Sequence, residues 1–134
     1  MKKINGGTQM RDVWRLPAIA PWEKSCGKHP PQKPLCVLSR IIQASTLPGA
    51  WVLDPFTGSS TTGIAANFLG RRFLGIDQNE AFLELSKARR EEINNMANRE
   101  VYLEKLQAQA KLFENSTHML KDACASDYGA DLPF

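Results

Sequence analysis

The sequence predicts an α/β protein in which parallel strands are flanked by helices. Residues 51–53 form a short apolar run, long enough for a buried parallel strand, and Asp54-Pro55 ends it. A small, hydroxyl-rich loop follows, and from 61 to 69 apolar residues recur at helical spacing. Residues 71–76 then have the character of a second strand. A strand, a crossover helix and a second strand make a parallel βαβ unit.

Each predicted strand is followed by an acidic residue, Asp54 after the first and Asp77 after the second. In dinucleotide-binding folds an acid about 20 residues beyond the loop, at the tip of the second strand, holds ribose hydroxyls. Asp54 and Asp77 have about that separation, and Gly58 allows a ligand to approach the loop backbone. The alternative is a structural βαβ unit whose two acids only cap strands or helices. Loop and acid together favour a ligand site.

The loop narrows the choice of ligand by what it lacks. It contains no Gly-Lys-Ser/Thr for nucleotide phosphates, and no Gly-x-Gly-x-x-Gly for NAD or FAD. An acid at the end of the first strand would repel a pyrophosphate. It would suit a ligand that carries an ammonium and a sulfonium group, such as S-adenosyl-L-methionine (AdoMet).

Two uncommon motifs now point to a family. Asp-Pro-Phe-Thr-Gly-Ser-Ser-Thr-Thr-Gly at 54–63 resembles the AdoMet-binding motif of DNA methyltransferases that act on adenine N6 or cytosine N4. His-Pro-Pro-Gln-Lys-Pro at 29–34 resembles a second motif of these enzymes, and Val-Trp-Arg-Leu-Pro at 13–17 a segment that often precedes it. The resemblance covers about residues 13–90 and implies a partial Rossmann-like methyltransferase fold. The family usually has glycine where Ser60 stands.

The resemblance implies a set of cofactor-binding residues and no catalytic or metal-binding residue in this chain. Asp54 and the loop would hold the methionine end of AdoMet, Asp77 would hold the ribose, and Gln32 and Lys33 would close the pocket. A helix is predicted from about Pro34, and its free N–H groups favour a ligand carboxylate near Lys33. The full set is Gln32, Lys33, Asp54, Phe56, Thr57, Gly58, Ser59, Ser60, Thr61 and Asp77.

The catalytic motif of the family is absent. Its members need an Asp/Asn/Ser-Pro-Pro-aromatic tetrad that accepts hydrogen bonds from the target amino group and stacks on the flipped base. No such tetrad occurs here, and Asp-Leu-Pro-Phe at 131–134 only imitates it. We therefore expect the carboxyl-terminal, AdoMet-binding portion of an enzyme that methylates double-stranded DNA, adenine N6 being favoured over cytosine N4. A partner chain with the catalytic half, or self-association, would complete the sheet.

Two alternatives stay open. The chain could be a non-catalytic AdoMet- or DNA-associating remnant that oligomerises through its carboxyl-terminal helix. A generic nucleotide-binding module is the second.

Composition is that of one globular domain, with 43% apolar and 23% charged residues. The formal net charge of +3 permits nucleic-acid binding without arguing for it. No segment has the length of a membrane span or the pattern of a signal peptide. Three cysteines without a CxxC spacing indicate neither a disulfide framework nor a zinc site. These features predict a reduced, cytoplasmic protein.

Four segments are expected along the chain. They are an extended or loop segment at 1–28, an AdoMet-binding part-domain at 29–93, a helical extension at 94–114 and a flexible tail at 115–134. Asn79 is predicted to cap a helix whose apolar residues 82, 83, 85 and 88 cover the sheet. In the extension, Met96, Leu103, Leu106, Ala110 and Phe113 approximate a heptad seam, which Arg99 interrupts. Trp14 and Trp22 are expected to be packing residues.

Overall fold

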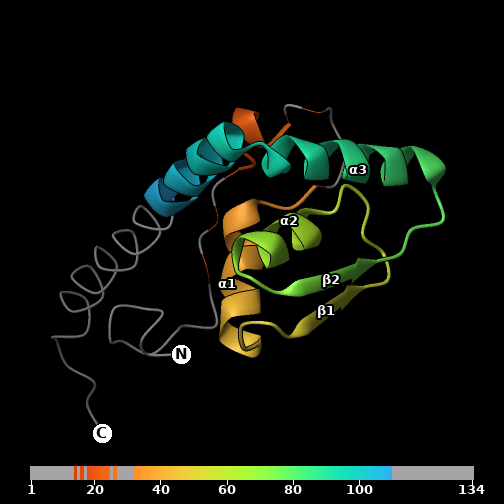
Figure 1. Cartoon of the computed structure of the whole chain (residues 1–134), viewed down its shortest axis with the longest axis horizontal. Coiled ribbons are helices and arrows are strands. Elements are labelled where there is room, and N and C mark those ends of the chain that lie inside the picture. The colour runs from red at the N-terminus through yellow and green to blue at the C-terminus, as the bar shows by residue number, and fades with distance from the viewer. Residues whose placement is uncertain (1–13, 15, 17, 25, 27–31, 110–134) are drawn as a thin grey trace, which may run out of the picture.

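A computed structural model gives the structure, and it describes residues 14, 16, 18–24, 26 and 32–109. Within that part of the chain the fold is α/β: a two-stranded parallel sheet with flanking helices (Figure 1). In chain order the elements are η2 (Pro21–Lys24), α1 (Leu35–Ser45), β1 (Trp51–Asp54), α2 (Thr61–Phe68), β2 (Arg72–Gly75) and α3 (Glu80–Asn94). Residues 96–109 form a further helical stretch.

The predicted βαβ unit is confirmed. β1 and β2 pair in parallel, with Leu53 opposite Leu74, and α2 is the crossover between them. Gly70 follows α2 with φ of +67°, a conformation that costs glycine little, and so lets the chain turn into β2. Asn79 caps α3 as predicted, because its Oδ1 accepts a hydrogen bond from the N–H of Ala81 at 3.0 Å.

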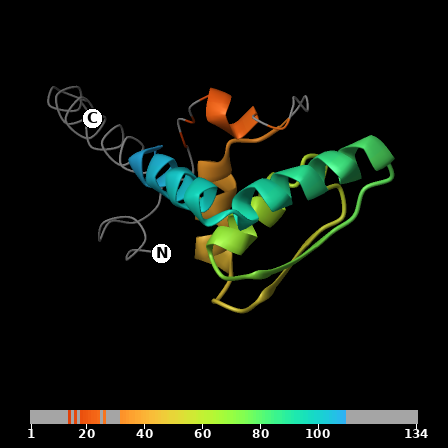
Figure 2. The same cartoon turned by 45° about the horizontal axis from the view of Figure 1, so that its top comes forward.

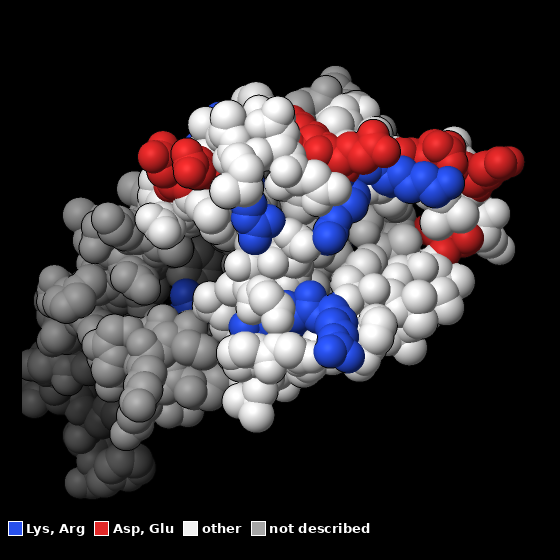
Figure 3. Space-filling model, viewed as in Figure 1, with Lys and Arg blue, Asp and Glu red and all other residues white. Residues whose placement is uncertain are grey.

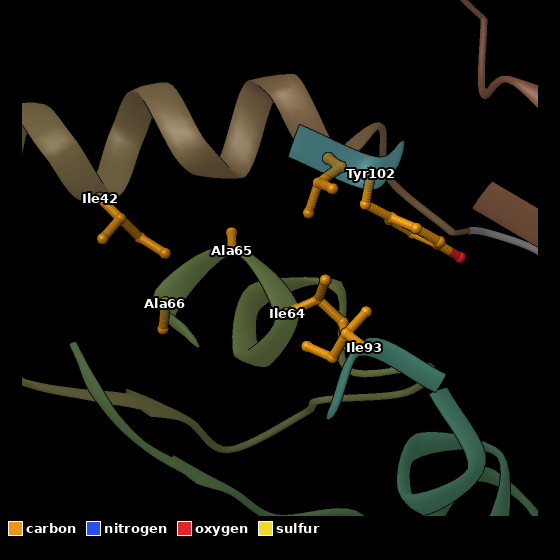
Figure 4. Close-up of a cluster of buried hydrophobic side chains, with 7 residues drawn as sticks. Ile42, Ile64, Ala65, Ala66, Ile93 and Tyr102 are labelled. Atoms are coloured by element: carbon orange, nitrogen blue, oxygen red, sulfur yellow. The ribbon is translucent and has the colours of Figure 1, made fainter. Parts of the chain in front are cut away.

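The core lies between the helices on one side of the sheet (Figure 4). The alanines Ala65 and Ala66 of α2 are fully buried, and Ala65 points toward α1, which its small side chain allows to approach closely near Ile42 (Figure 4). Ile93 of α3 and Tyr102 of the 96–109 stretch complete the cluster beside Ile64 (Figure 4). Helices α1, α2 and α3 all lie on the same side of the strands in both orientations (Figures 1 and 2).

The opposite face of the sheet is bare within the described residues. Trp51 and Leu53 of β1 are 65% and 61% exposed, and Leu74 and Ile76 are 54% and 52% exposed. The apolar run at 51–53 is therefore not the buried strand that its composition predicts, since only alternate residues such as Val52 pack against the core. Parallel strands are normally covered on both faces, and this sheet is covered on one.

α3 does not cover the sheet as its apolar residues predict. Leu83, Ser86 and Lys87 of α3 and Phe73 of β2 are among the residues around a cavity of about 460 Å³ between the two elements. Ala88 is exposed, and the fully buried residues of α3 are Arg89 and Ile93. The helix is therefore oriented by a buried arginine and an isoleucine, which periodicity of apolar residues alone does not select.

The 96–109 stretch packs on the domain through Leu106 of the predicted seam and through residues outside that seam. Met96 is 71% exposed, whereas Tyr102 is buried, with its ring edge-on to Trp22 at 5.0 Å and its hydroxyl bonded to Glu92 Oε2 at 3.0 Å. Arg99 donates to Asn67 Oδ1 at 2.6 Å and lies over the ring of Phe68. Arg99, the residue that interrupts the predicted heptad seam, therefore makes its contacts with α2 of the same chain. Ala110 and Phe113 lie outside the described residues, as do 131–134.

Candidate functional site

A cavity of about 210 Å³ opens at the carboxyl end of β1. Its walls come from the segment before α1, from α1 itself, from the last residue of β1 and from the loop that leads into α2. The lining residues are Gln32, Lys33, Leu38, Asp54, Phe56, Thr57, Gly58, Ser59, Thr61 and Thr62. The structure thus brings together all the predicted cofactor-binding residues except Ser60 and Asp77.

Two lining residues were missed in the sequence. Leu38 is one of the apolar residues of α1 and carried no sign of facing a ligand. Thr62 ends the hydroxyl-rich stretch of the sequence and is the second residue of α2, and a site limit one residue later would have included it. Its hydroxyl donates to Asp54 Oδ2 at 2.6 Å.

Asp54 is the anionic group of the cavity. Besides the bond from Thr62, its Oδ1 accepts a hydrogen bond from the N–H of Phe56 at 3.1 Å. These bonds fix the carboxylate and leave further lone pairs, since an ionised carboxylate accepts about four hydrogen bonds. A fixed carboxylate in a cavity wall can bind an ammonium or sulfonium group without reorganising.

Asp77 follows β2 and accepts hydrogen bonds from two backbone N–H groups, and its predicted ribose contact stays a prediction. Its Oδ2 accepts from the N–H of Gly58 at 2.9 Å, and its Oδ1 accepts from the N–H of Asn79 at 2.9 Å. Asp77 therefore ties the loop to the end of β2, as in the capping alternative. Asp77 contacts Gly58 but is not one of the residues that line the cavity. A ribose contact would use its remaining lone pairs.

The loop turns through two residues with positive φ, Gly58 at +51° and Ser60 at +57°. Ser60 is the one non-glycine residue with positive φ in the described part of the chain. It precedes α2 and faces the larger cavity beside β2 rather than the site. The departure from the family's usual glycine is therefore at a position where the backbone favours glycine.

Replacing Ser60 with glycine is expected to raise the free energy of unfolding by about 0.5–1 kcal/mol, because it removes the left-handed strain at a small entropic cost. Urea unfolding measures the change. Ser59→Gly is the matched control, since Ser59 is also buried but has no positive φ, and it should not stabilise the protein. Equal effects at the two positions would contradict the strain argument.

Two buried oxygens in the cavity wall have no hydrogen-bond partner among the described residues. They are Gln32 Oε1 and Thr57 Oγ1. The amide nitrogen of Gln32 donates to the carbonyl of Glu23 at 2.8 Å, which turns its oxygen the other way. An unsatisfied buried acceptor costs about 1–3 kcal/mol. The group of the cavity lining that fits an ammonium is the carboxylate of Asp54.

The amino end of α1 is not free for a ligand carboxylate in the way predicted. Glu23, which is 1% exposed, reaches it from η2, and its Oε2 accepts from the N–H of Leu35 at 2.7 Å. Burial raises the pKa of Glu23, against the opposing effects of the backbone hydrogen bonds and of the charge on Arg89. The protein's own carboxylate thus occupies the first turn, while Lys33 remains exposed at the cavity.

The raised pKa of Glu23 predicts a pH dependence of stability. Between the ordinary value of 4.5 and the raised value the folded protein binds the proton that the unfolded chain has lost, so stability falls as pH rises through this window. Glu23→Gln should show a weaker fall, because glutamine does not ionise. Urea unfolding at several pH values tests this. Glu84→Gln, at an exposed position of α3, should retain the wild-type profile, and a Glu23→Gln profile identical to wild type would contradict the prediction.

Other kinds of site find no support in the described residues. No group of three or more His, Cys, Asp and Glu residues there could hold a metal ion. Cys26 and Cys36 form no disulfide within the described residues, the thiol of Cys26 donates to Glu92 Oε2 at 3.1 Å, and Cys124 lies outside that part of the chain. None of the helices described has the length and apolarity to cross a membrane.

Comparison with known proteins identifies the family. The N6/N4 DNA methylase family model matches residues 1–88. The chain belongs to this DNA methylase family. This confirms the resemblance that the motifs at 29–34 and 54–63 indicate. The match includes the α/β unit and the whole of the cavity lining.

Individual relatives of this DNA methylase chain support the same family assignment. It is 59% identical over 93 residues to the type II methyltransferase M2.MboI of Moraxella bovis, and 51% identical over 94 residues to M2.DpnII of Streptococcus pneumoniae. These alignments cover 69% and 70% of the chain but only 34% and 35% of the relatives. The chain thus spans about a third of the length of the curated relatives it matches.

Among solved structures, the complex of M1.HpyAVI with SAM is similar, with 42% sequence identity and a TM-score of 0.51. The similarity covers 55% of the methylase chain and 35% of that structure. The ligand named for that protein is the one that the loop and the family resemblance predict for this chain. The partial methyltransferase fold expected from the sequence is therefore confirmed by the two-stranded parallel sheet and this likeness.

Proposed function

We propose that this chain is the AdoMet-binding part of a site-specific DNA methyltransferase, which transfers a methyl group to an exocyclic amino group. The observation that carries the proposal is the cavity at the end of β1, where the carboxylate of Asp54 is fixed by Thr62 and by the N–H of Phe56 among the other lining residues that the family resemblance implies. Adenine N6 is favoured over cytosine N4 as the target because adenine is the commoner target in the family.

The roles we propose follow the geometry. Asp54 and the loop at 56–61 hold the methionine end of AdoMet, and the side chains of Gln32 and Lys33 close the pocket. Asp77 supports the loop through Gly58 and adds a ribose contact. When bound, AdoMet supplies an activated methyl group on a sulfonium. The residues of this chain contribute by orienting it, so that the amino nitrogen of the target base can attack in line.

The cavity has room for part of the cofactor. Pockets that enclose a whole small molecule have volumes of about 300–1,000 Å³, whereas this one has about 210 Å³. Phe56, 88% exposed, stands at its edge and would gain a neighbour from a further wall. We infer that the rest of the pocket comes from the polypeptide that carries the catalytic tetrad, since the printed sequence has none.

The bare side of the sheet is where this catalytic part would pack. Its patch consists of Trp51, Leu53, Leu74 and Ile76, with Arg72 lying over the ring of Trp51 at 5.7 Å. In addition, β1 pairs only with β2 among the described residues, so its other edge can accept a strand. A catalytic half built from strands and helices would cover both. A second copy of this chain is the competing occupant.

We expect DNA to approach from the side of the cavity, where Lys33 is the exposed basic residue of the lining. A basic side chain there would attract the phosphate backbone. α3 has no such uniform charge, since exposed glutamates at 80, 84 and 91 alternate with the exposed Lys87 and Arg90, and acidic and basic side chains lie next to one another at the top of Figure 3.

Two measurements test the proposed function. Calorimetry of the full chain with AdoMet and with NAD separates a methyltransferase from a general nucleotide-binding module. NAD binding without AdoMet binding would reject the proposal. Methyl transfer to DNA is then assayed for the chain alone and with a neighbouring-gene product that carries the tetrad. Activity only in the mixture supports a split enzyme, and AdoMet binding with no activity in either case indicates a non-catalytic remnant.

A further inference from the structure

Two residues of α3 form hydrogen bonds with the loop that lines the cavity. They contact the side of the loop that faces away from the cavity. Ser86 and Arg89 are three positions apart and therefore share one helix face. Ser86 Oγ lies 2.8 Å from the carbonyl of Gly58 and 2.8 Å from that of Phe82 in its own helix, so its one proton is shared between them. Arg89 Nη1 donates to the carbonyl of Ser59 and to Thr61 Oγ1, the latter at 3.1 Å. Three of the loop residues that line the cavity are thus bonded to α3.

Burial of Arg89 carries a desolvation cost that an apolar packing residue would not have. Arg89 is 3% exposed, and burial lowers the pKa of its guanidinium. It forms no ion pair with an acid within the described residues, and the hydrogen bonds found for it go to the loop. Leucine or methionine would fill such space without the desolvation cost. The two acceptors of the loop offset part of this cost, together with the charges of Glu23 and Glu92. The direct hydrogen bonds of Arg89 therefore tie the loop to α3.

The direction of these bonds matters for the cavity. Because the carbonyls of Gly58 and Ser59 are held toward α3, the loop turns its opposite side to the site. Asp77 holds the N–H of Gly58 from β2, and the positive φ of Gly58 and Ser60 is compatible with this path. Neither Ser86 nor Arg89 lines the cavity. Any effect of these two residues on a ligand must therefore pass through the loop.

We propose that Ser86 and Arg89 are positioning residues, which hold the loop at 57–61 in the conformation that binds the cofactor. The inference rests on the proposed AdoMet site, and it adds that affinity is controlled from α3, a helix that does not line the cavity. A preorganised loop binds without an ordering cost, and a released loop must be ordered by the ligand. Removing the hydrogen bonds between α3 and the loop should therefore lower the affinity for AdoMet even where the free energy of unfolding changes little.

The test uses the full chain with three substitutions of Arg89 and its neighbours. Arg89→Met keeps the side-chain length but removes the donors, and it should weaken AdoMet binding at least about tenfold. Arg89→Lys keeps one charged donor and should recover binding to within about threefold of wild type. Arg90→Met, at the next and exposed position, is the matched control and should leave affinity unchanged. Calorimetry with AdoMet gives the affinities.

Hydrogen exchange of the loop amides in the free protein gives a second readout that needs no ligand. Exchange at 58–61 should accelerate in Arg89→Met, while exchange in α1 should not change. If Arg89→Met does not fold, Ser86→Ala replaces it, and it should weaken binding by about threefold to tenfold. Arg89→Met or Ser86→Ala with wild-type affinity and wild-type loop exchange would overturn the inference. If wild type binds no AdoMet, the proposed function fails, and loop exchange alone decides whether α3 holds the loop.

Discussion

Asp54→Asn is expected to weaken AdoMet binding by about tenfold to a hundredfold, with a change of less than about 1 kcal/mol in the free energy of unfolding. Asparagine has the same shape and can still accept the N–H bond from Phe56, so the turn after β1 should persist. What disappears is the negative charge that faces the cavity. Calorimetry gives the affinity and urea unfolding gives the stability.

The charge argument also predicts how the loss depends on the ligand and on salt. S-adenosylhomocysteine lacks the sulfonium charge but keeps the ammonium group, so it should lose less affinity than AdoMet in Asp54→Asn. Raising the ionic strength should weaken wild-type binding more than binding by the variant. Thr62→Val removes the hydrogen bond that fixes Asp54 but keeps the negative charge, so it should weaken AdoMet binding less than Asp54→Asn does. If Asp54→Asn bound AdoMet as tightly as wild type, the assignment of the cavity to the methionine end would be lost.

What the sequence predicts well here is local. Strand, loop and helix at 51–69 are specified by short-range features: an apolar run, an acid followed by proline, and a change to helical spacing. Gly70 and Asn79 mark helix boundaries because their effects act within one turn. The two motifs of the family then place residues 32–33 beside the loop, and the cavity brings them together.

What the sequence does not reveal depends on contacts between distant residues. Nothing near Glu23 indicates that its carboxylate meets the N–H of Leu35, and nothing near Arg89 indicates that this arginine is buried against Ser59. Both look like ordinary surface charges in their own segments. The exposure of Leu53 is equally invisible, because a short apolar run is the same whether one face of its sheet or both are covered.

Leu53→Lys is expected to leave the fold intact and to prevent association with the catalytic part of the methyltransferase. The side chain is 61% exposed at the centre of the bare patch, opposite Leu74, so lysine there remains hydrated in the free chain. The free energy of unfolding should change by less than about 0.5 kcal/mol. In the complex the same lysine would be buried without a partner, which should weaken association by at least about thirtyfold.

The adjacent residue supplies the matched control, because strand neighbours point to opposite faces. Val52 packs against the core on the helix side, so Val52→Lys should lower the free energy of unfolding by about 3 kcal/mol or more. Urea unfolding compares the two variants, and co-purification with the neighbouring-gene product that carries the tetrad measures association.

Sedimentation of the chain alone tests the other occupant, since a dimer that dissociates in Leu53→Lys would place a second copy on this face. Undiminished association of Leu53→Lys in both assays would mean that the bare face is not the docking surface.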